Sequence, residues 1–359
     1  MNDLQPLSGD PEDQLTPETR ETTPAPVCVH CKQREPLEGY PTRLCAECRQ
    51  YFIHYPIPNW IKAFAAGILV VVVFACFSLP RQLSTEINKA KGEKAEGEGR
   101  FVTASRAFQK ASKDLPGDVE LNCHLFICAA YCGDIGGIRK YWALIEGKTI
   151  EDEALRAQVS EAVNVVANYT PSDVLDTLSK QFPDRIPDTT YSRAMKQYPD
   201  DLSIALTYAG ALYNENKYDS CAALLSGILG RDKSDVPALT LAGFTAVERK
   251  QPDSAIYYCD QLLQINREDI TALSSKARNL LRLGKDQDAV EPAEKAYELN
   301  DTLPYTIGTM ILLYHFTNQQ AKRDQLIRKA RTFSDSSDKA AVKYIFDVVD
   351  GKEPFRTTK

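Results

Sequence analysis

The sequence predicts an all-α protein in which a superhelix of paired helices follows a single transmembrane helix and a small N-terminal metal-binding module. Three observations lead to this fold class. A pattern of small and apolar residues recurs every 34 residues in the C-terminal half, and a repeat of this length is typical of stacked helical hairpins. The stretch Ala63–Leu79 contains no charged residue. Two Cys-x-x-Cys pairs lie between Cys28 and Cys48.

The composition sets the broad limits. The chain has 359 residues, of which 43% are hydrophobic, and this is enough apolar material for a real core. The net charge of −6 disfavours binding to a nucleic-acid backbone, which requires a basic face. Residues 1–27 contain six carboxylates, one arginine and no apolar run. We therefore expect a disordered acidic tail there and no cleavable signal peptide.

The cysteines of residues 28–50 predict a structural zinc site. Cys28 and Cys31 form one pair, Cys45 and Cys48 form the other, and thirteen residues separate the pairs. Each Cys-x-x-Cys turn places two thiolates on one knuckle, and two knuckles complete a tetrahedral Zn²⁺ site with no open position for catalysis. The segment resembles the zinc ribbon family over about twenty residues, with a short hairpin between the knuckles. A redox-active or disulfide-bonded set of thiols is the alternative, and His30 is a possible replacement ligand.

Residues 60–80 predict the transmembrane helix. Ala63–Leu79 spans about 25 Å as a helix, and its flanks bring it to the thickness of a bilayer. Trp60 is suited to the headgroup level, Lys62 can extend outward from the apolar stretch, and Pro80 closes it. The alternative is a buried core helix or strand, because four consecutive valines also suit a sheet.

Helical repeats occupy most of the remaining chain. Segments that begin at Leu202, Val236, Ile270 and Pro304 align at 34 residues without a gap. A small residue that lets two helices approach closely recurs as Cys221, Ala255 and Ala289. The turns between the paired helices read Asn216-Lys217-Tyr218, Lys250-Gln251-Pro252, Gly284-Lys285-Asp286 and Asn318-Gln319-Gln320. Upstream, the same offsets give the turns Gly99-Arg100-Phe101 and Gly133-Asp134-Ile135.

This pattern resembles the tetratricopeptide repeat family. The resemblance covers about residues 85–337, with two repeats in 85–151 and four in 202–337, and residues 338–349 follow as an amphipathic capping helix. Residues 152–201 depart from the pattern, because the turn glycine is missing and Pro171, Pro183 and Pro187 crowd in. We expect one degenerate and one incomplete repeat there. Two separate arrays are the alternative.

The resemblance also implies a function and a surface. Members of this family bind protein or peptide partners in a groove lined by the first helix of each pair. The corresponding positions here are Tyr213, Asn214, Phe244, Glu248, Arg278, Arg282, Tyr305, His315 and Phe316. These nine groove residues are expected to face a solvent-filled concavity. The family's clamp for a carboxylate-ended tail is not reproduced, because Gly210 and Phe244 stand where it needs asparagine.

No phosphate-binding loop, zincin helix or nucleophile elbow is present, so we expect a non-enzyme. The sequence favours a membrane-anchored scaffold, with the cysteine module in the cytoplasm and the repeats across the bilayer, although basic residues flanking the span favour the reverse orientation. A zinc- or thiol-based sensor that signals through the span is the alternative. Nucleic-acid binding by the cysteine module is a third and weaker hypothesis, which rests on Lys32, Arg34, Arg43 and Arg49.

Overall fold

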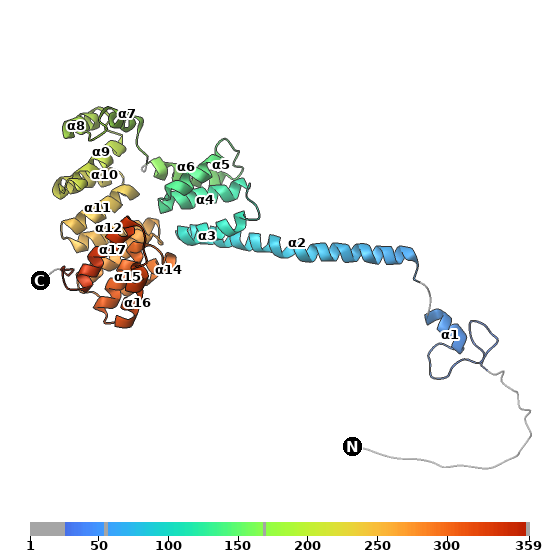
Figure 1. Ribbon diagram of the computed structural model, residues 1–359. Helices are drawn as coiled ribbons and strands as arrows, with labels where there is room; N and C mark the ends of the chain where they lie inside the picture. Colours follow the sequence, from blue (N-terminus) through green and yellow to red (C-terminus); the bar gives the residue numbers. More distant parts are fainter. Residues whose placement is uncertain (1–25, 54–56, 168–169, 357–359) are drawn as a thin grey trace, which may run out of the picture. The chain divides into compact units, whose positions relative to one another are not determined.

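The computed structural model describes residues 26–53, 57–167 and 170–356, except for the side chains of residues 75–82 (Figure 1). The acidic tail predicted for residues 1–27 lies almost entirely outside these described residues. Within them, all regular structure is helical, which confirms the all-α class. The helices are α1 (Ala46–Ile53), α2 (Asn59–Gly97), α3 (Phe101–Ser112), α4 (Val119–Cys132), α5 (Ile135–Ile145), α6 (Glu153–Ala167), α7 (Asp173–Gln181), α8 (Asp188–Gln197), α9 (Leu202–Asn214), α10 (Tyr218–Arg231), α11 (Val236–Glu248), α12 (Pro252–Ile265), α13 (Ile270–Arg282), α14 (Val290–Leu299), α15 (Pro304–Phe316), α16 (Gln320–Ala330) and α17 (Ser336–Val349).

The chain divides into two compact units, Met1–Cys76 and Phe77–Lys359, and the boundary falls inside α2. The first unit contains the cysteine module, α1 and the start of α2. The second contains all the remaining helices.

Helix α2 differs from the transmembrane helix that the sequence predicts. It continues through Pro80 and ends only at Gly97, so the helix extends beyond the end that the sequence predicts for the span. In the part of the chain whose residues are described, no helix is long and apolar enough to cross a membrane. The predicted span extends into residues 75–82, whose side chains lie outside the described set.

The last turns of α2 form the first helix of the first repeat. A Cβ atom added to Gly92 would lie 2.5 Å from the ring of Phe108 on α3, so a glycine is required for this close approach. Phe108 is fully buried and stacks on His124 of α4, with the ring centroids 4.7 Å apart. The apolar side chains of α3, α4, α5 and α6 complete one hydrophobic core with Ala95 of α2.

Four regular helix pairs follow, α9–α10, α11–α12, α13–α14 and α15–α16, and their first helices begin at the four predicted positions. The turn inside each pair starts with a residue of positive φ, namely Asn216, Lys250, Gly284 and Asn318, each 34 residues after the previous one. The predicted small residues Cys221, Ala255 and Ala289 are completely buried. Helix α17 packs on α15 and closes the array. This arrangement confirms the predicted helical-repeat superhelix.

Residues 152–201 form the lone helix α6 and the short pair α7–α8. Helix α6 belongs to the core of the preceding helices, through Leu155, Val159 and Ala162. Helices α7 and α8 share a separate core with α9, in which Tyr191 stacks on Tyr208 at 4.7 Å. The core of α3–α6 and the core of α7–α9 are therefore separate clusters, and residues 168–169 between α6 and α7 lie outside the described residues.

The first repeat also contacts the region between α12 and α13, about 165 residues further along the chain (Figure 1). The carboxylate of Glu268, which is 3% exposed, accepts 2.7 Å hydrogen bonds from the backbone N–H and the hydroxyl of Thr103. Thr103 is the third residue of α3, and Arg100 provides no side-chain cap there. Glu268 thus caps α3 from a distant repeat. The backbone N–H of Arg267 donates to the carbonyl of Gly99 at 2.9 Å, which closes the superhelix on itself.

Candidate functional site: a four-cysteine cluster and the groove residues

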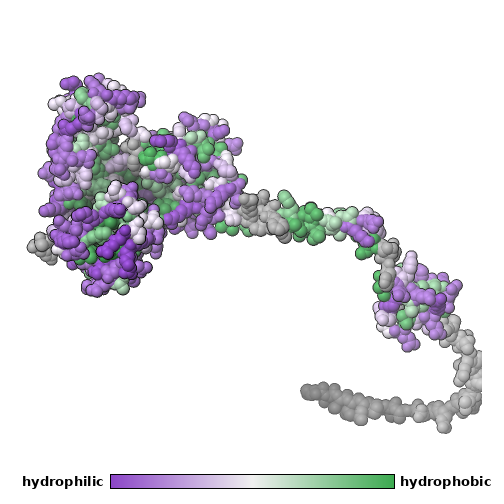
Figure 2. Space-filling view, in the orientation of Figure 1, coloured by the Kyte–Doolittle hydropathy of each residue, from purple (hydrophilic) through white to green (hydrophobic). Residues whose placement is uncertain are grey.

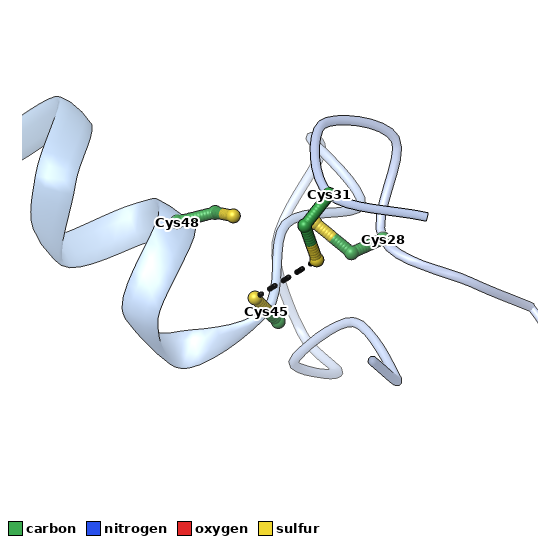
Figure 3. Close-up of side chains that lie close together, drawn as sticks. All are labelled: Cys28, Cys31, Cys45 and Cys48. Atoms are coloured by element: carbon green, nitrogen blue, oxygen red, sulfur yellow. Dashed lines mark hydrogen bonds between the residues drawn. The ribbon is translucent and has the colours of Figure 1, made fainter. Parts of the chain in front are cut away.

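The structure brings the four predicted cysteines together (Figure 3). Cys28 and Cys31 lie on a turn, Cys45 lies just before α1, and Cys48 lies on the first turns of α1. All four sulfur atoms are within 4.8 Å of one another. Cys28 and Cys45 are buried, whereas Cys31 and Cys48 are half-buried. The two pairs therefore meet in space although thirteen residues separate them.

The sulfur spacing fits a tetrahedral metal site. The Sγ atoms of Cys31 and Cys45 are 3.8 Å apart. A tetrahedron with zinc–sulfur bonds of about 2.3 Å has sulfur–sulfur edges of about 3.8 Å. A disulfide requires about 2.05 Å, and all four cysteines are free thiols here. The donor set and its spacing thus fit Zn²⁺, which these four side chains would hold without a vacant position.

The thiols differ in acidity. Backbone N–H groups, that of Cys31 above all, lower the pKa of the Cys28 thiol to about 6. Burial and the neighbouring sulfur atoms raise the pKa of Cys48. A backbone N–H group, that of Gln33, also lowers the pKa of Cys31. Without a cation the first knuckle therefore favours thiolates, whereas Cys48 opposes a further negative charge. A divalent cation removes this repulsion, because it stabilises every thiolate that it binds.

Side chains around the cluster link the first knuckle to α1. His30 Nδ1 lies 3.4 Å from Cys48 Sγ, so this imidazole contacts a ligand sulfur atom from outside the four-cysteine set. The His30 ring packs edge-on against Phe52 of α1, and Arg34 forms an ion pair with Glu47. The expected ribbon hairpin is wrong: residues 26–45 form turns and loops, and the second knuckle leads directly into a helix. Cross-links such as Val29 N–H to the Arg43 carbonyl, 2.9 Å, are too few for a strand pair.

The groove residues lie on the first helices of the four regular pairs. Tyr213 and Asn214 end α9, Phe244 and Glu248 lie on α11, Arg278 and Arg282 on α13, and Tyr305, His315 and Phe316 on α15. All nine are half-buried or exposed, and their surroundings differ. Phe244 lines a small void with Cys259 and Ser275 between helices. Tyr213 contacts Tyr218 edge to face at 5.5 Å.

Arg278 corrects the expectation of free groove side chains. Its guanidinium donates 2.8 Å hydrogen bonds to the hydroxyl of Thr309 and to the backbone carbonyl of Tyr305, and it lies 3.9 Å from the centroid of the Tyr305 ring. Burial lowers the pKa of this guanidinium. A Cβ atom on Gly308 would lie 2.9 Å from Arg278 Nη2, so the glycine leaves space for it. Arg278 therefore holds α13 against α15.

Two further groove residues, Arg282 and Phe316, contact the C-terminal segment of the chain, residues 353–356, which we call the tail. Phe355 of the tail is 8% exposed and stacks on Phe316 at 5.5 Å, while the guanidinium of Arg282 lies 4.9 Å from its ring centroid. Sequence reasoning missed the tail. The signal was present, because an aromatic and a basic residue follow the capping helix after Pro354.

A cavity of about 690 Å³ adjoins the tail. Its lining includes Glu248 from the end of α11, Lys250 from the turn that follows, Arg282 from α13, and Tyr344 from α17. Two of the predicted groove residues, Glu248 and Arg282, thus line one opening beside the tail. We call the surface formed by Arg282, Asp286, Phe316 and Tyr344, which contacts the tail, the tail seat.

A second group of metal-ligating side chains occurs on the first two repeats. Glu93, Glu120 and His124 have ligand atoms within 4.8 Å of one another, and the carboxylate of Glu96 lies 3.0 Å from His124 Nδ1. Lys89 already forms a 2.8 Å ion pair with Glu120. The ammonium group of Lys89 thus already balances the charge of one of the three side chains, and we assign no metal to this cluster.

Comparison with known proteins gives structural neighbours only. No family model matches the chain, and no curated protein matches it. The solved structures it is similar to include pilF of Pseudomonas aeruginosa, with 12% identity, 74% of this chain and 99% of that chain covered, and a TM-score of 0.36. A tetratricopeptide repeat protein of Parabacteroides merdae gives 13% identity, 74% and 99% coverage, and a TM-score of 0.36. The TPR2AB domain of yeast Sti1, solved as a complex with pHSP90, gives 13% identity, 65% and 98% coverage, and a TM-score of 0.30.

Proposed function

We propose that the chain is a non-catalytic scaffold of the tetratricopeptide type, which holds a protein or peptide partner on the surface around the tail seat. One observation carries this proposal: aromatic and arginine side chains there already bind an extended segment, the chain's own tail. Aromatic and arginine side chains are also those that dominate the energy of protein interfaces. The adjoining 690 Å³ cavity provides room for a longer segment.

Photo-crosslinking from the full-length chain tests the scaffold proposal. A photo-reactive amino acid at Glu248, which is exposed beside the cavity, should capture a partner from cell extract. The same group at Tyr257, which is 58% exposed on the second helix α12, is the matched control and should capture much less. Adding Arg282→Ala should then reduce capture at position 248. Equal capture at both positions, or capture at position 248 that does not change with Arg282→Ala, would refute the assignment of the partner site to the tail seat.

We propose further that Cys28, Cys31, Cys45 and Cys48 hold a structural Zn²⁺ ion. The 3.8 Å sulfur spacing and the close approach of all four thiols support this. The competing function is a thiol-based sensor, which the lowered pKa of Cys28 favours, because a thiolate is the reactive form. Metal content and free thiols measured before and after mild peroxide separate the two. A structural site keeps its zinc, whereas a sensor releases it as thiols are lost.

Membrane attachment through residues 60–80 is the third part of the proposal. Eight apolar side chains between Phe64 and Phe74 are 46–70% exposed on α2, and Figure 2 shows this apolar stretch on the helix surface. A helix that is apolar on all sides is typically covered by a core or by lipid. We place the cysteine module in the cytoplasm and the repeats across the bilayer. The full chain should stay with membranes after an alkaline wash, and Val70→Lys with Val72→Glu should release it.

A further inference from the structure

The tail binds its seat as a peptide ligand would, because side-chain contacts hold it and it forms no helix or strand. After α17 ends at Val349, the chain turns at Gly351, where φ is 72°. The hydroxyl of Tyr344 on α17 then donates a 3.0 Å hydrogen bond to the carbonyl of Pro354. Pro354 has no N–H group of its own to satisfy, so an extended segment can begin there without losing a hydrogen bond.

Phe355 provides the apolar contact of the tail. It is the last buried aromatic residue of the described chain, and its ring lies between Phe316 on α15 and the guanidinium of Arg282 on α13. Each also has a contact within its own helix: Arg282 donates a 3.0 Å hydrogen bond to the side-chain oxygen of Asn279, and the Phe316 ring lies 4.9 Å from that of His315. Burial of an aromatic ring is the main attraction available to so short a segment.

Arg356 provides the charged contact. Its Nη2 atom lies 2.6 Å from both carboxylate oxygen atoms of Asp286, and its guanidinium lies 4.3 Å from the centroid of the Phe316 ring. Asp286 stands in the turn of the third regular pair, two residues after the positive-φ residue Gly284. The seat thus recognises an aromatic side chain and a positive charge on adjacent residues.

These contacts are few and lie at the surface, so another segment can replace them. Arg356 and Asp286 keep side-chain exposures of 41% and 27%. The advantage of the tail over a free segment is its covalent attachment, because a short tether gives it an effective concentration on the order of millimolar. The neighbouring cavity along Glu248, Lys250 and Arg282 lets a longer segment make contacts that the tail cannot make.

We propose that the tail is an internal ligand of the tail seat, and that the partner displaces it with a segment in which a basic residue directly follows an aromatic one. This proposal rests on the scaffold function above and names the partner's chemistry. The proposal rests on the ion pair of Asp286 with Arg356 and on the contacts of Phe355 with Phe316 and Arg282. A partner segment without the aromatic residue, or with an acidic residue after it, is excluded from the seat.

Fluorescence anisotropy with a labelled peptide of residues 350–359 tests the proposal. The peptide should bind a chain that ends at Lys352, and it should bind the full-length chain about 10-fold more weakly, because the tethered tail competes. A peptide with Phe355→Ala should bind neither chain. Equal binding to both chains, or no binding to the shortened chain, would overturn the inference. Circular dichroism must show the same helicity for both chains.

Because removal of Phe355 can loosen α17, a charge exchange provides a second test that keeps the apolar contact. In the shortened chain, Asp286→Arg should abolish binding of the natural peptide and create binding of the Arg356→Asp peptide. Failure of the exchange would overturn the assignment of Asp286 as the recognition group. Crosslinking from position 248 is scored separately, so loss of partner capture with intact peptide binding refutes the scaffold function and leaves the internal ligand standing.

Discussion

The cysteine module and the helical repeats are held together in opposite ways. The described part of the module, residues 26–53, buries almost no apolar side chain other than Cys28 and Cys45. The repeats bury a continuous series of small residues, including Cys221, Ala255 and Ala289, between successive helices. A cluster of four thiols therefore substitutes in one region for the core that the other region builds from packing.

The difference shows what kind of change each region tolerates. With the proposed zinc site, the stability of the module depends chiefly on its four sulfur atoms, and the contacts around them, such as Arg34 with Glu47, are fewer and more exposed. In the repeats, stability is shared between neighbouring pairs, so a defect in one pair weakens the next. The closing contact of Glu268 with Thr103 adds a link between distant repeats that an open superhelix lacks.

Removing one cysteine should have the largest effect. Cys45→Ser is expected to abolish zinc binding and unfold the module, because metal binding contributes roughly 10–16 kcal/mol to the folding of comparable zinc peptides. The repeats should keep their melting temperature. Zinc content by mass spectrometry and limited proteolysis of the full chain measure the two outcomes. Ser8→Cys, outside the four-cysteine set, is the matched control and should leave one zinc per chain.

A buried charge in the repeats should have the next largest effect. Ala289 is completely buried, and Ala289→Glu is expected to destabilise the array by about 3–5 kcal/mol, because it places an unpaired carboxylate between packed helices. Ala289→Ser adds one uncharged polar atom and changes the volume little, so it should cost much less. Thermal melting monitors the repeats, and zinc content should stay unchanged in both variants. Loss of zinc with the repeats would show that the two regions are coupled.

The repeat pattern could be predicted because packing between helices demands a small residue at a fixed spacing. The helix starts at Leu202, Val236, Ile270 and Pro304 follow directly from this periodicity. The meeting of the two cysteine pairs could also be predicted, because two Cys-x-x-Cys turns separated by a short segment are typical of a four-thiolate metal site. Both signals are local or periodic, so they are visible in a single sequence.

Contacts between distant segments could not be predicted in this way. Glu268 is one acid among many in the sequence, and nothing local indicates that it caps α3. Arg278 occupies a predicted groove position, but its bonds to Tyr305 and Thr309 depend on how α13 meets α15. The continuation of α2 through Pro80 also opposes the local helix-breaking tendency of proline, which costs about 3 kcal/mol inside a helix.

The closing contact provides a prediction of intermediate size. Glu268→Ala is expected to cost about 1–3 kcal/mol, since it leaves the N–H and hydroxyl of Thr103 without their acceptor and removes the cap of α3. Hydrogen exchange should become faster in the first turn of α3 and not in α15. Glu291→Ala on α14 removes an exposed acid from the same array and serves as the control. Unchanged exchange in α3 would show that the superhelix does not depend on this closure.

The smallest expected effect is a dependence of the tail seat on pH. Burial first, and then the positive charges of Arg323 and Arg356, lower the pKa of His315 below its ordinary value of 6.5. The folded state therefore binds fewer protons at this site than the unfolded state, so its contribution to stability is complete above 6.5 and declines as the pH falls below that value. Protonation would also place a third positive charge near Arg356, and this opposes seating of the tail.

We accordingly expect the full-length chain to bind the labelled 350–359 peptide more readily at pH 5 than at pH 7.5, relative to the chain that ends at Lys352, because the tail is seated less firmly at the lower pH. His315→Gln keeps a neutral polar side chain and should remove this difference between the two pH values. His30 is a histidine of the other unit, so His30→Gln is the matched control and should leave the difference intact. A pH dependence that survives His315→Gln would assign the effect to other groups, such as the carboxylate of Asp286 that contacts Arg356.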